Sequence, residues 1–464
     1  MNALAAAQEK MRSVGLPEQA IDVFTAFYHQ LDEGASGLIP ESEVEPLTDV
    51  ASIDSLDFDD ETLRRAAAET VVIKLNGGLG TTMGMTQAKS LLPIKHRLSF
   101  LDLIVDQVWH VRSTLGVDLP LLFMNSFRTR DDTLAALAAY PDLEVEGLPM
   151  DFLQNREPKL RADDLEPVEW PADPALEWCP PGHGDLYTAL VTSGALQQLL
   201  DAGYLYASVS NSDNLGAAPD AAMAGWFAAS GAPFAAEVAR RTLADRKGGH
   251  LVVRRSDGRL VLRETAQTPA ADLAAAGDVE RHRYFNTNNL WLDLRALATE
   301  LERTGGVLEL PLIVNPKTVD PTDPTSTPVI QMESAMGAAI EVFEGATVIE
   351  VDRSRFLPVK ATSDLLLLRS DVYELGDDFT LTAAVEAPLV DLDGRYYKLV
   401  GDFDTRFGAG APSLRRASVL TVRGDWTFGQ GVVATGDAVL EDAGEPSTVP
   451  DGALVGPEGI VGLA

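Results

Sequence analysis

The sequence predicts an α/β fold, in which helices cover both faces of a mainly parallel, twisted sheet, followed by a small β-helix-like unit. Three observations support this prediction. Between residues 62 and 210 apolar strand patterns alternate with helical patterns, as in sheets built from strand–helix units. A glycine-rich turn follows the first strand. Residues 386–464 lose the helical pattern and repeat apolar residues at every sixth position.

The expected elements follow one another in a regular order. Residues 1 to about 35 place apolar side chains at helical spacing, and residues 34–60 form a polar connecting segment. The elements after it are a helix over 62–69, a strand over 70–75, a helix over 100–115, a strand over 119–124, a helix over 131–140, a helix over 188–202 and a strand over 204–210. We therefore expect an N-terminal helical segment at 1–60, a main domain at 61–385 and a C-terminal domain at 386–464.

Two apolar series characterise the C-terminal domain. One series is Val422, Phe428, Ala434 and Leu440, and the other is Leu420, Trp426, Val432 and Ala438. A six-residue period is typical of β-helix coils. Because short β patterns arise easily, an irregular β-hairpin domain is the alternative interpretation.

Composition narrows the class of function. The chain has 464 residues with a formal net charge of −33, so it should repel nucleic acid and anionic lipid. No apolar run reaches the length of a membrane helix, and the short apolar stretch at residues 3–7 ends at charged residues, unlike a signal peptide. We therefore expect a cytoplasmic protein with neither nucleic acid nor membrane as a partner.

The single cysteine and the few lysines are also informative. Cys179 has no partner for a disulfide and no activating neighbour, so a packed thiol beside a turn is expected. The chain has nine lysines, and five lie in or beside the motifs described below: Lys74, Lys89, Lys95, Lys317 and Lys360. In an arginine-rich chain, such positions favour a role for a compact ammonium group.

The glycine loop after the first strand, residues 77–84, suits anion binding because backbone N–H groups can approach a ligand closely. By itself it is a weak signal, since a plain tight turn has the same composition. The dinucleotide fingerprint fails because Met83 occupies the third glycine position. The P-loop motif fails because Ala88 precedes Lys89 and Ser90. Lys89 remains as a cation that could close over phosphates held by the loop.

Several separated segments resemble one known family. They are Leu75–Gly84 with Lys89-Ser90, Trp178–Asp185, Ser210–Gly216, Phe285–Trp291, Ile313–Thr318 and Arg353–Lys360. In this order they resemble the eukaryotic-type UTP–glucose-1-phosphate uridylyltransferases and cover roughly residues 60–400. The resemblance implies a Rossmann-like nucleotidyltransferase fold of the GT-A-like kind, with a mixed sheet and a small C-terminal left-handed β-helix. It also implies transfer of uridylyl from UTP to glucose 1-phosphate with Mg²⁺.

The resemblance also implies roles for individual residues. Lys360 and Lys89 would be catalytic, and Asp213 would hold the metal. The substrate-binding set would be Leu75, Asn76, Gly77, Gly78, Lys89, Gln154, Gly182, His183, Asn211, Asp213, Asn286, Asn288 and Lys360. Because Asn286 and Asn288 alternate on an expected strand, they should face the same side.

The residues themselves leave simpler interpretations open. Asn211 and Asp213 could form an Asx turn after a strand, and Lys360 could be a surface lysine. The asparagines of the 285–291 segment could cap strand ends.

Three alternatives compete with the leading function. The same chemistry could act on galactose 1-phosphate or an N-acetylhexosamine 1-phosphate. The chain could instead bind a nucleotide sugar without catalysis, or be an NAD-dependent oxidoreductase. Departures from the family are Cys179, where an aromatic residue is usual, a longer loop over Val319–Thr327, and a short C-terminal domain through which homo-oligomers would form.

Overall fold

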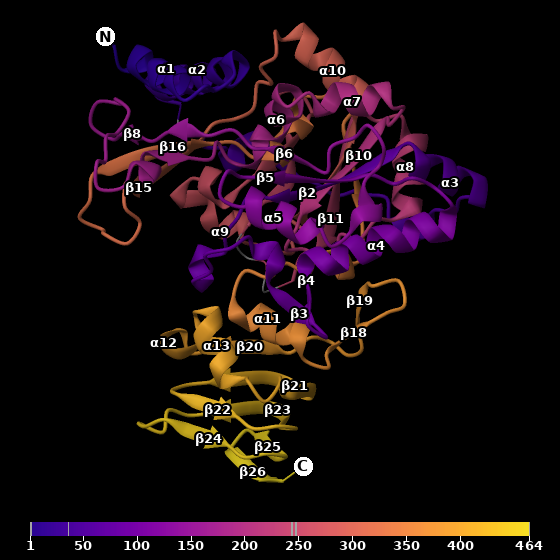
Figure 1. Ribbon diagram of the computed structural model, residues 1–464, viewed down its shortest axis with the longest axis vertical. Helices are drawn as coiled ribbons and strands as arrows, with labels where there is room; N and C mark the ends of the chain where they lie inside the picture. Colours follow the sequence, from indigo (N-terminus) through magenta and orange to yellow (C-terminus); the bar gives the residue numbers. More distant parts are fainter. Residues whose placement is uncertain (1, 36, 243–244, 246–247, 464) are drawn as a thin grey trace.

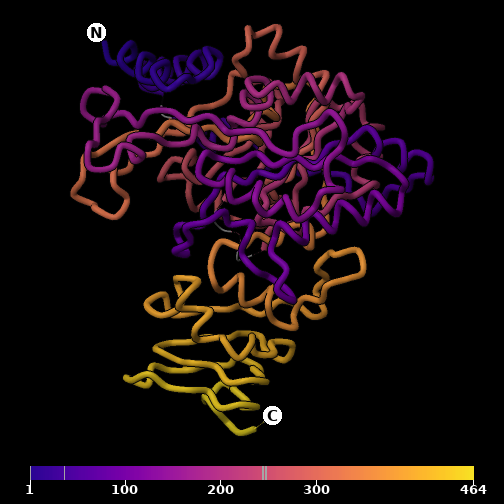
Figure 2. The backbone as a smooth tube through the Cα atoms, viewed as in Figure 1, coloured from indigo at the N-terminus to yellow at the C-terminus, as the bar shows by residue number. Residues whose placement is uncertain are grey.

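A mixed sheet forms the centre of the protein. The computed structural model describes residues 2–35, 37–242, 245 and 248–463. Among them, ten strands form one sheet with the order β1-β12-β14-β10-β2-β5-β6, with β11 and β17 continuing from β14 and with β13 beside β12. Figure 1 shows this large α/β body and a smaller β unit that carries the C-terminus, and Figure 2 shows the two termini at opposite ends of the molecule.

The helices and strands have the following bounds. The helices are α1 Ala3–Ser13, α2 Glu18–Asp32, α3 Asp60–Ala68, α4 Phe100–Leu115, α5 Arg130–Leu137, α6 Leu186–Thr192, α7 Ala195–Asp201, α8 Ala221–Ser230, α9 Leu273–Ala276, α10 Leu294–Arg303, α11 Thr362–Arg369, α12 Gly394–Tyr397 and α13 Val400–Arg406. The strands of the large sheet are β1 Val44–Pro46, β2 Thr70–Asn76, β5 Leu121–Asn125, β6 Asp151–Leu153, β10 Tyr206–Asn211, β11 Phe234–Arg240, β12 His250–Arg254, β13 Leu260–Arg263, β14 Tyr284–Asp293 and β17 Thr347–Glu350.

The remaining strands lie in smaller sheets. Those before the C-terminal unit are β3 Pro93–Lys95, β4 Leu98–Ser99, β7 Glu157–Pro158, β8 Leu160–Arg161, β9 Trp178–Cys179, β15 Ile313–Thr318, β16 Pro328–Glu333, β18 Tyr373–Leu375 and β19 Leu381–Ala383. Those of the C-terminal unit are β20 Leu389–Leu392, β21 Ser413–Val422, β22 Trp426–Phe428, β23 Val433–Leu440, β24 Ser447–Val449, β25 Ala453–Gly456 and β26 Gly459–Leu463.

The expectation of a mainly parallel sheet is correct for one half only. Strands β10, β2, β5 and β6 run parallel to one another. Strand β14 runs antiparallel to both β10 and β11, so the sheet is mixed. Register places Asn76 beside Asn125, and Asn211 beside Leu75. The carboxyl ends of β2, β5 and β10 therefore lie at one edge, where ligands bind in such sheets.

Side-chain alternation along β2 explains why helices cover both faces of the sheet. Val71, Ile73 and Leu75 are buried in the core cluster that contains α6, α7 and α10. Val72 is buried in the other large cluster, together with α4. Successive residues of a strand point to opposite faces, so a strand that is buried along its whole length, as β2 is, needs cover on both sides.

Several expected elements have different bounds in the structure. The expected helix over 188–202 is two helices, α6 and α7, because Gly194 interrupts it with a left-handed φ of +78°. The expected strand over 119–124 begins at Leu121, after Pro120. The connecting segment at 34–60 contains β1, which pairs with β12 at the edge of the sheet.

The apolar repeats of the C-terminal unit are confirmed. Strands β20, β21, β23 and β25 form a parallel ladder, and β22 pairs in parallel with β24. Val422 lies opposite Leu440 and Leu420 opposite Ala438, so both predicted series recur in register. All of their members are buried except Trp426, which is partly buried. The one antiparallel pair of this ladder, among the described residues, is β25 with β26.

Two buried histidines anchor the N-terminal segment to the sheet. The rings of His250 and His282 lie 4.6 Å apart, and His282 Nε2 donates to Glu41 Oε1 at 3.0 Å. Burial lowers the pKa of His250 to about 2 and also lowers the pKa of His282. The imidazole of His250 is therefore neutral in the folded protein at neutral and mildly acidic pH.

Acid should destabilise the protein through these histidines. As pH falls below 6.5, the unfolded state takes up a proton on His250 and the folded state does not. Stability that is complete above pH 6.5 is thus lost toward pH 2, by about 1.4 kcal/mol per pH unit. Urea unfolding at pH 7, 6 and 5 measures this slope. We expect a shallower slope for His250→Phe and no change for His29→Gln, whose imidazole is exposed; equal slopes in all three proteins would contradict this account.

Candidate active site

A lysine–aspartate pair lies where β2 and β10 end. Lys89 follows the glycine loop, and its Nζ lies 2.6 Å from Oδ2 of Asp213, just beyond β10. Their side chains are 14% and 19% exposed. Lys89 also donates to the carbonyl of Val359, whose N–H donates to the carbonyl of Asp213 at 3.2 Å. Three segments far apart in the sequence therefore meet at this ion pair.

Lys360 lies next to the Lys89–Asp213 pair. It follows Val359, whose backbone is hydrogen-bonded to Lys89 and to Asp213. The backbone N–H of Lys360 donates to Asp364 Oδ2 at 2.7 Å, at the start of α11. The Lys360 side chain is exposed. Burial raises the pKa of Glu264, and the Lys360 charge opposes that rise. The structure thus brings the three residues with predicted phosphate or metal roles to one edge of the sheet.

The glycine loop is open toward solvent at its centre. Gly80 and Gly84 have left-handed φ values of +67° and +73°. The N–H of Lys89 donates to the carbonyl of Gly78 at 3.1 Å, which closes the loop onto the lysine. A side chain at Gly78 would have no heavy atom of the described residues within 4 Å. The backbone at Gly78 is therefore free to face a ligand.

Leu75 and Asn76 support the loop from below. Leu75 is buried in the core, and its carbonyl accepts from the N–H of Ser212 at 3.0 Å. The Asn76 amide donates to Asn125 and Thr133 and accepts from Ser212 at 3.0 Å. Because these bonds occupy the amide inside the protein, the Asn76 side chain holds the carboxyl ends of three strands together.

Gln154 and Gly182 lie together opposite the start of the loop. Gln154 Nε2 donates to the carbonyl of Gly182 at 2.8 Å. A methyl group at Gly77 would lie 2.8 Å from Gln154 Oε1, so a side chain there would displace the glutamine amide. Gly182 has a φ of +79°, and a side chain there would lie 2.5 Å from the carbonyl of Ser334. These residues form one wall of the site.

His183 is a neutral imidazole held in one tautomer. Its Nδ1 accepts from the N–H of Met336 at 2.9 Å, so the proton of the neutral ring is on Nε2. Burial lowers the pKa of His183 to about 4. The ring therefore stays neutral at physiological pH and offers one N–H donor.

Asp185 is a supporting residue that we did not single out from the sequence. Its carboxylate accepts from the N–H of Asn155 at 2.6 Å and from the Asn155 amide at 2.9 Å. Burial raises the pKa of Asp185 to about 7. Because Asn155 is next to Gln154, this contact joins the Gly-His-Gly segment to the glutamine. The resemblance covered Asp185, but its type and spacing gave no separate signal.

The asparagines of β14 reach the site, but not through strand alternation. Asn288 has a left-handed φ of +61°, and the pairing of β11 with β14 shifts register at this point. The expectation that Asn286 and Asn288 share a side because they alternate is therefore wrong in its reasoning. Instead, the N–H of Asn288 donates to Asn286 Oδ1 at 3.2 Å, and the Asn288 amide donates to Asn211 Oδ1 at 3.3 Å. The bulge brings all three asparagines together.

Comparison with known proteins decides the family. The chain matches the profile of the UDPGP family, described as UTP–glucose-1-phosphate uridylyltransferase, over residues 21–434. It belongs to this family. A UTP–glucose-1-phosphate uridylyltransferase from Musa acuminata is 40% identical over 412 residues, covering 86% of this chain and 85% of the relative. One from Solanum tuberosum is 38% identical over 432 residues, covering 92% and 86%.

Solved structures of UDPGP family members agree with the fold. A mutant UDP-glucose pyrophosphorylase from Leishmania major, in complex with UDP-glucose, is 41% identical with a TM-score of 0.91, covering 98% of each chain. The UDP-glucose phosphorylase from Trypanosoma brucei is 41% identical with a TM-score of 0.89, covering 97% of this chain and 98% of its own. The family resemblance and the mixed α/β fold are thus confirmed.

In this UDPGP family member a buried ion pair supports the segment that leads to Lys360. Arg355 donates to both carboxylate oxygens of Glu237, at 2.7 and 2.8 Å. Glu237 is fully buried and also accepts from Asn289 and Trp291, each at 3.0 Å. Burial would raise the pKa of Glu237, but the Arg355 charge holds it below its ordinary value. The pair lies 118 positions apart in sequence, so no local pattern indicated it.

The other predicted lysines have structural positions in this family member. Lys74 is fully buried and donates to Ser210 Oγ at 2.8 Å and to the carbonyl of Ala217 at 2.7 Å, and burial lowers its pKa to about 7. It therefore holds the segment that carries Asp213. Lys95 donates to three carbonyls at and beyond the end of α11. Lys317 is exposed on β15.

Two of the three departures expected from the sequence, Cys179 and the loop Val319–Thr327, have defined hydrogen bonds in the structure. Cys179 is buried, its Sγ lies 3.7 Å from the carbonyl of Glu157, and burial raises the pKa of its thiol. The expected packed thiol is confirmed. The loop Val319–Thr327 joins β15 to β16 and is closed by a hydrogen bond from the N–H of Val319 to the carbonyl of Thr327 at 2.9 Å. Ser326 makes further hydrogen bonds to Asp320 and Asp323.

Proposed function

We propose that this chain transfers the uridylyl group of UTP to glucose 1-phosphate and releases pyrophosphate. The observation that carries the proposal is the meeting of Lys89, Asp213 and the Lys360 segment beside the glycine loop. Family membership supports the substrates. With a net charge of −33, the protein needs such a local concentration of cationic groups to hold two polyanions.

The chemistry needs positioning and charge stabilisation. An oxygen of the sugar phosphate attacks the α-phosphorus of UTP in line with the departing pyrophosphate, and no covalent enzyme intermediate forms. The nucleophile is already an anion, so no strong base is required. In this proposal the ammonium of Lys89 moves from Asp213 to the nucleotide phosphates as they enter the glycine loop. The exposed ammonium of Lys360 faces the reacting phosphates and stabilises the charge that develops there.

The residues at the site fit a divalent metal. Mg²⁺ prefers oxygen ligands and is often bound by one or two carboxylates together with substrate phosphates. Asp213 offers such a carboxylate, since among the described residues no hydrogen bond reaches its Oδ1. Among the described residues, no group of three His, Cys, Asp or Glu side chains is suited to hold a metal. We therefore propose that substrate phosphates supply the other ligands of the metal. When bound, the metal would neutralise phosphate charge.

Substituting Asp213 should change the requirement for metal. For Asp213→Asn we expect the Mg²⁺ concentration that gives half-maximal turnover to rise at least about tenfold, because a neutral amide is a weaker Mg²⁺ ligand. Titration of initial rate against Mg²⁺ measures this. Asp132→Asn is the control, since Asp132 contacts the same loop region through the N–H of Ala88 but lies outside the proposed metal site. An unchanged Mg²⁺ curve for Asp213→Asn would refute the metal assignment.

The remaining residues are proposed to select the two substrates. Gln154, Gly182 and His183 would contact the base and its surroundings, since the glutamine amide offers both a donor and an acceptor. Gly77 and Gly78 would face the nucleotide, with Leu75 and Asn76 supporting them. Asn211, Asn286 and Asn288 would bind sugar hydroxyls.

We also propose the domain bounds and the type of each domain. We assign a GT-A-like domain at 61–385 after a helical segment at 1–60, and a left-handed β-helix at 386–464. The parallel ladder of β20, β21, β23 and β25 supports the last assignment. Homo-oligomers would form through this domain, in the cytoplasm, with neither nucleic acid nor membrane as a partner. No helix among the described residues is long and apolar enough to cross a bilayer.

Pyrophosphate release across a panel of sugar phosphates tests the function. With UTP and Mg²⁺, we expect glucose 1-phosphate to be turned over fastest, ahead of galactose 1-phosphate and N-acetylhexosamine 1-phosphates. Faster turnover of one of these would refute the glucose assignment. Binding of UTP with no turnover of any sugar phosphate would favour a non-catalytic nucleotide-sugar-binding protein instead.

A further inference from the structure

One short segment of the C-terminal domain touches both sides of the candidate active site. Leu399 lies against the glycine loop, since a methyl group at Gly84 would be only 3.0 Å from Leu399 Cδ2. Two residues earlier, the carbonyl of Tyr397 accepts from Thr362 Oγ1 at 2.6 Å. Thr362 is the first residue of α11 and lies two positions after Lys360. Residues 397–399 therefore join the loop before Lys89 to the helix after Lys360.

The C-terminal domain is tied firmly to α11 at both ends of that helix. At its start Thr362 binds Tyr397, which is fully buried and whose hydroxyl donates to the carbonyl of Trp426 at 2.7 Å. At its end Arg369 donates to Asp404 at 2.5 Å, and its guanidinium lies 5.5 Å from the ring of Phe403. The helix after Lys360 and the C-terminal domain are thus held as one unit.

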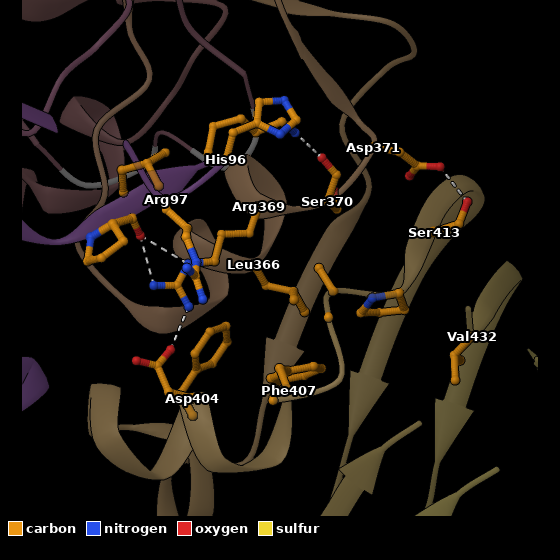
Figure 3. Close-up of a pocket in the computed structure, with 18 of the residues that line it drawn as sticks. His96, Arg97, Leu366, Arg369, Ser370, Asp371, Asp404, Phe407, Ser413 and Val432 are labelled. Carbon is orange, nitrogen blue, oxygen red and sulfur yellow. Dashed lines mark hydrogen bonds and ion pairs between the residues drawn. The ribbon is translucent and has the colours of Figure 1, made fainter. Parts of the chain in front are cut away.

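The C-terminal domain does not pack tightly everywhere against α11 and the β3–β4 hairpin. A cavity of about 800 Å³ lies between the β3–β4 hairpin, α11 and the C-terminal domain. Figure 3 shows Leu366 and Arg369 of α11 on one side of it and Phe407 and Val432 on the other. The hairpin is tied to the far end of α11, where Lys95 donates to three carbonyls and Arg369 donates to the carbonyl of Pro93 at 2.8 Å. The contact of Leu399 with Gly84 lies at the other end of the helix, between the unit and the glycine loop itself.

We infer that Leu399 is a positioning residue, which acts together with the hydrogen bond from Lys89 to the Val359 carbonyl to set the distance between the glycine loop and the α11 unit with Lys360. This inference rests on the proposed function, because the spacing matters only if both lysines act on the same phosphates. A displacement of about 1 Å between reacting groups is enough to lower turnover strongly. Leu399 is 44% exposed, so its role differs from that of a core residue whose loss unfolds the protein.

The test compares three substitutions in the full-length protein. Leu399→Ala should lower kcat about 10- to 100-fold, with the Kd for UTP and the melting temperature nearly unchanged. Leu399→Met, which conserves volume, should restore most of kcat. Leu389→Ala is the matched control, since Leu389 is a leucine of the same domain that is 64% exposed, and it should behave as wild type. A kcat for Leu399→Ala within twofold of wild type would overturn the inference.

Amide hydrogen exchange gives a second readout that does not depend on turnover. Exchange in peptides covering residues 77–91 should be faster in Leu399→Ala than in wild type and unchanged in Leu389→Ala. Identical exchange in all three proteins would also overturn the inference. If the wild-type protein releases no pyrophosphate, the proposed function fails, and exchange still decides whether Leu399 holds the loop.

Discussion

Lys360→Ala should lower kcat by about 100- to 1000-fold, while the Kd for UTP should change by less than about threefold. The magnitude is that expected when a preorganised group that stabilises charge in the transition state is removed. Binding survives because the nucleotide phosphates are held by the glycine loop and Lys89, which the substitution leaves intact. Steady-state pyrophosphate release gives kcat, and calorimetric titration with UTP gives Kd.

Lys317→Ala is the control for this result, since Lys317 is an exposed lysine in another matched segment. It should retain full turnover. Two outcomes contradict the assignment of Lys360: turnover that survives nearly intact, or a loss of UTP binding as large as the loss of kcat. The second outcome would make Lys360 a binding residue and leave the reacting phosphates without a cation from this segment.

The second large effect is on stability. Arg355→Ala leaves the Glu237 carboxylate buried without its cation, and breaking such a pair costs about 3–5 kcal/mol. The backbone carbonyl of Arg355 accepts from the amides of Asn214 and Asn289, both at 3.1 Å. Loss of the ion pair should loosen this segment, which leads to Lys360, so kcat should fall as well. Urea unfolding monitored by circular dichroism measures the loss of stability.

Arg240→Ala is a matched control for the buried pair. Arg240 donates to both carboxylate oxygens of Glu350 in the same way, but its side chain is 64% exposed. Exposed pairs contribute about 0–1 kcal/mol, so this variant should unfold close to the wild-type midpoint. If the two arginine variants lose equal stability, burial of the Glu237 pair is not what holds the Lys360 segment.

The parts of the site that lie next to regular elements could be predicted from residue patterns. The glycine loop follows β2, whose residues are all buried, and Asp213 follows β10, so apolar strand patterns and turn composition indicated both positions. Their meeting with Lys360 required the family resemblance, because contacts between positions 89, 213 and 359 leave no local pattern. The break at Gly194 is a local feature that a stricter treatment of glycine would have found.

Other features depend on tertiary pairing. The reversal of the sheet at β14 and the bulge at Asn288 arise because β14 pairs with three strands at once. Alternation assumes a regular strand, but β14 has extra residues opposite β11 at Asn288, so alternation does not give the orientation of the asparagines. The same holds for the Glu237–Arg355 pair, whose members look like ordinary charged residues until the fold buries them together.

A single-turnover experiment with UTP labelled at its α-phosphorus tests the central claim most directly. With excess enzyme, Mg²⁺ and glucose 1-phosphate, the account predicts that the label passes to UDP-glucose in an amount equal to the pyrophosphate released. It also predicts no label on acid-quenched protein and no pyrophosphate without the sugar phosphate. Label on the protein, or release of pyrophosphate without glucose 1-phosphate, would contradict direct transfer at this site.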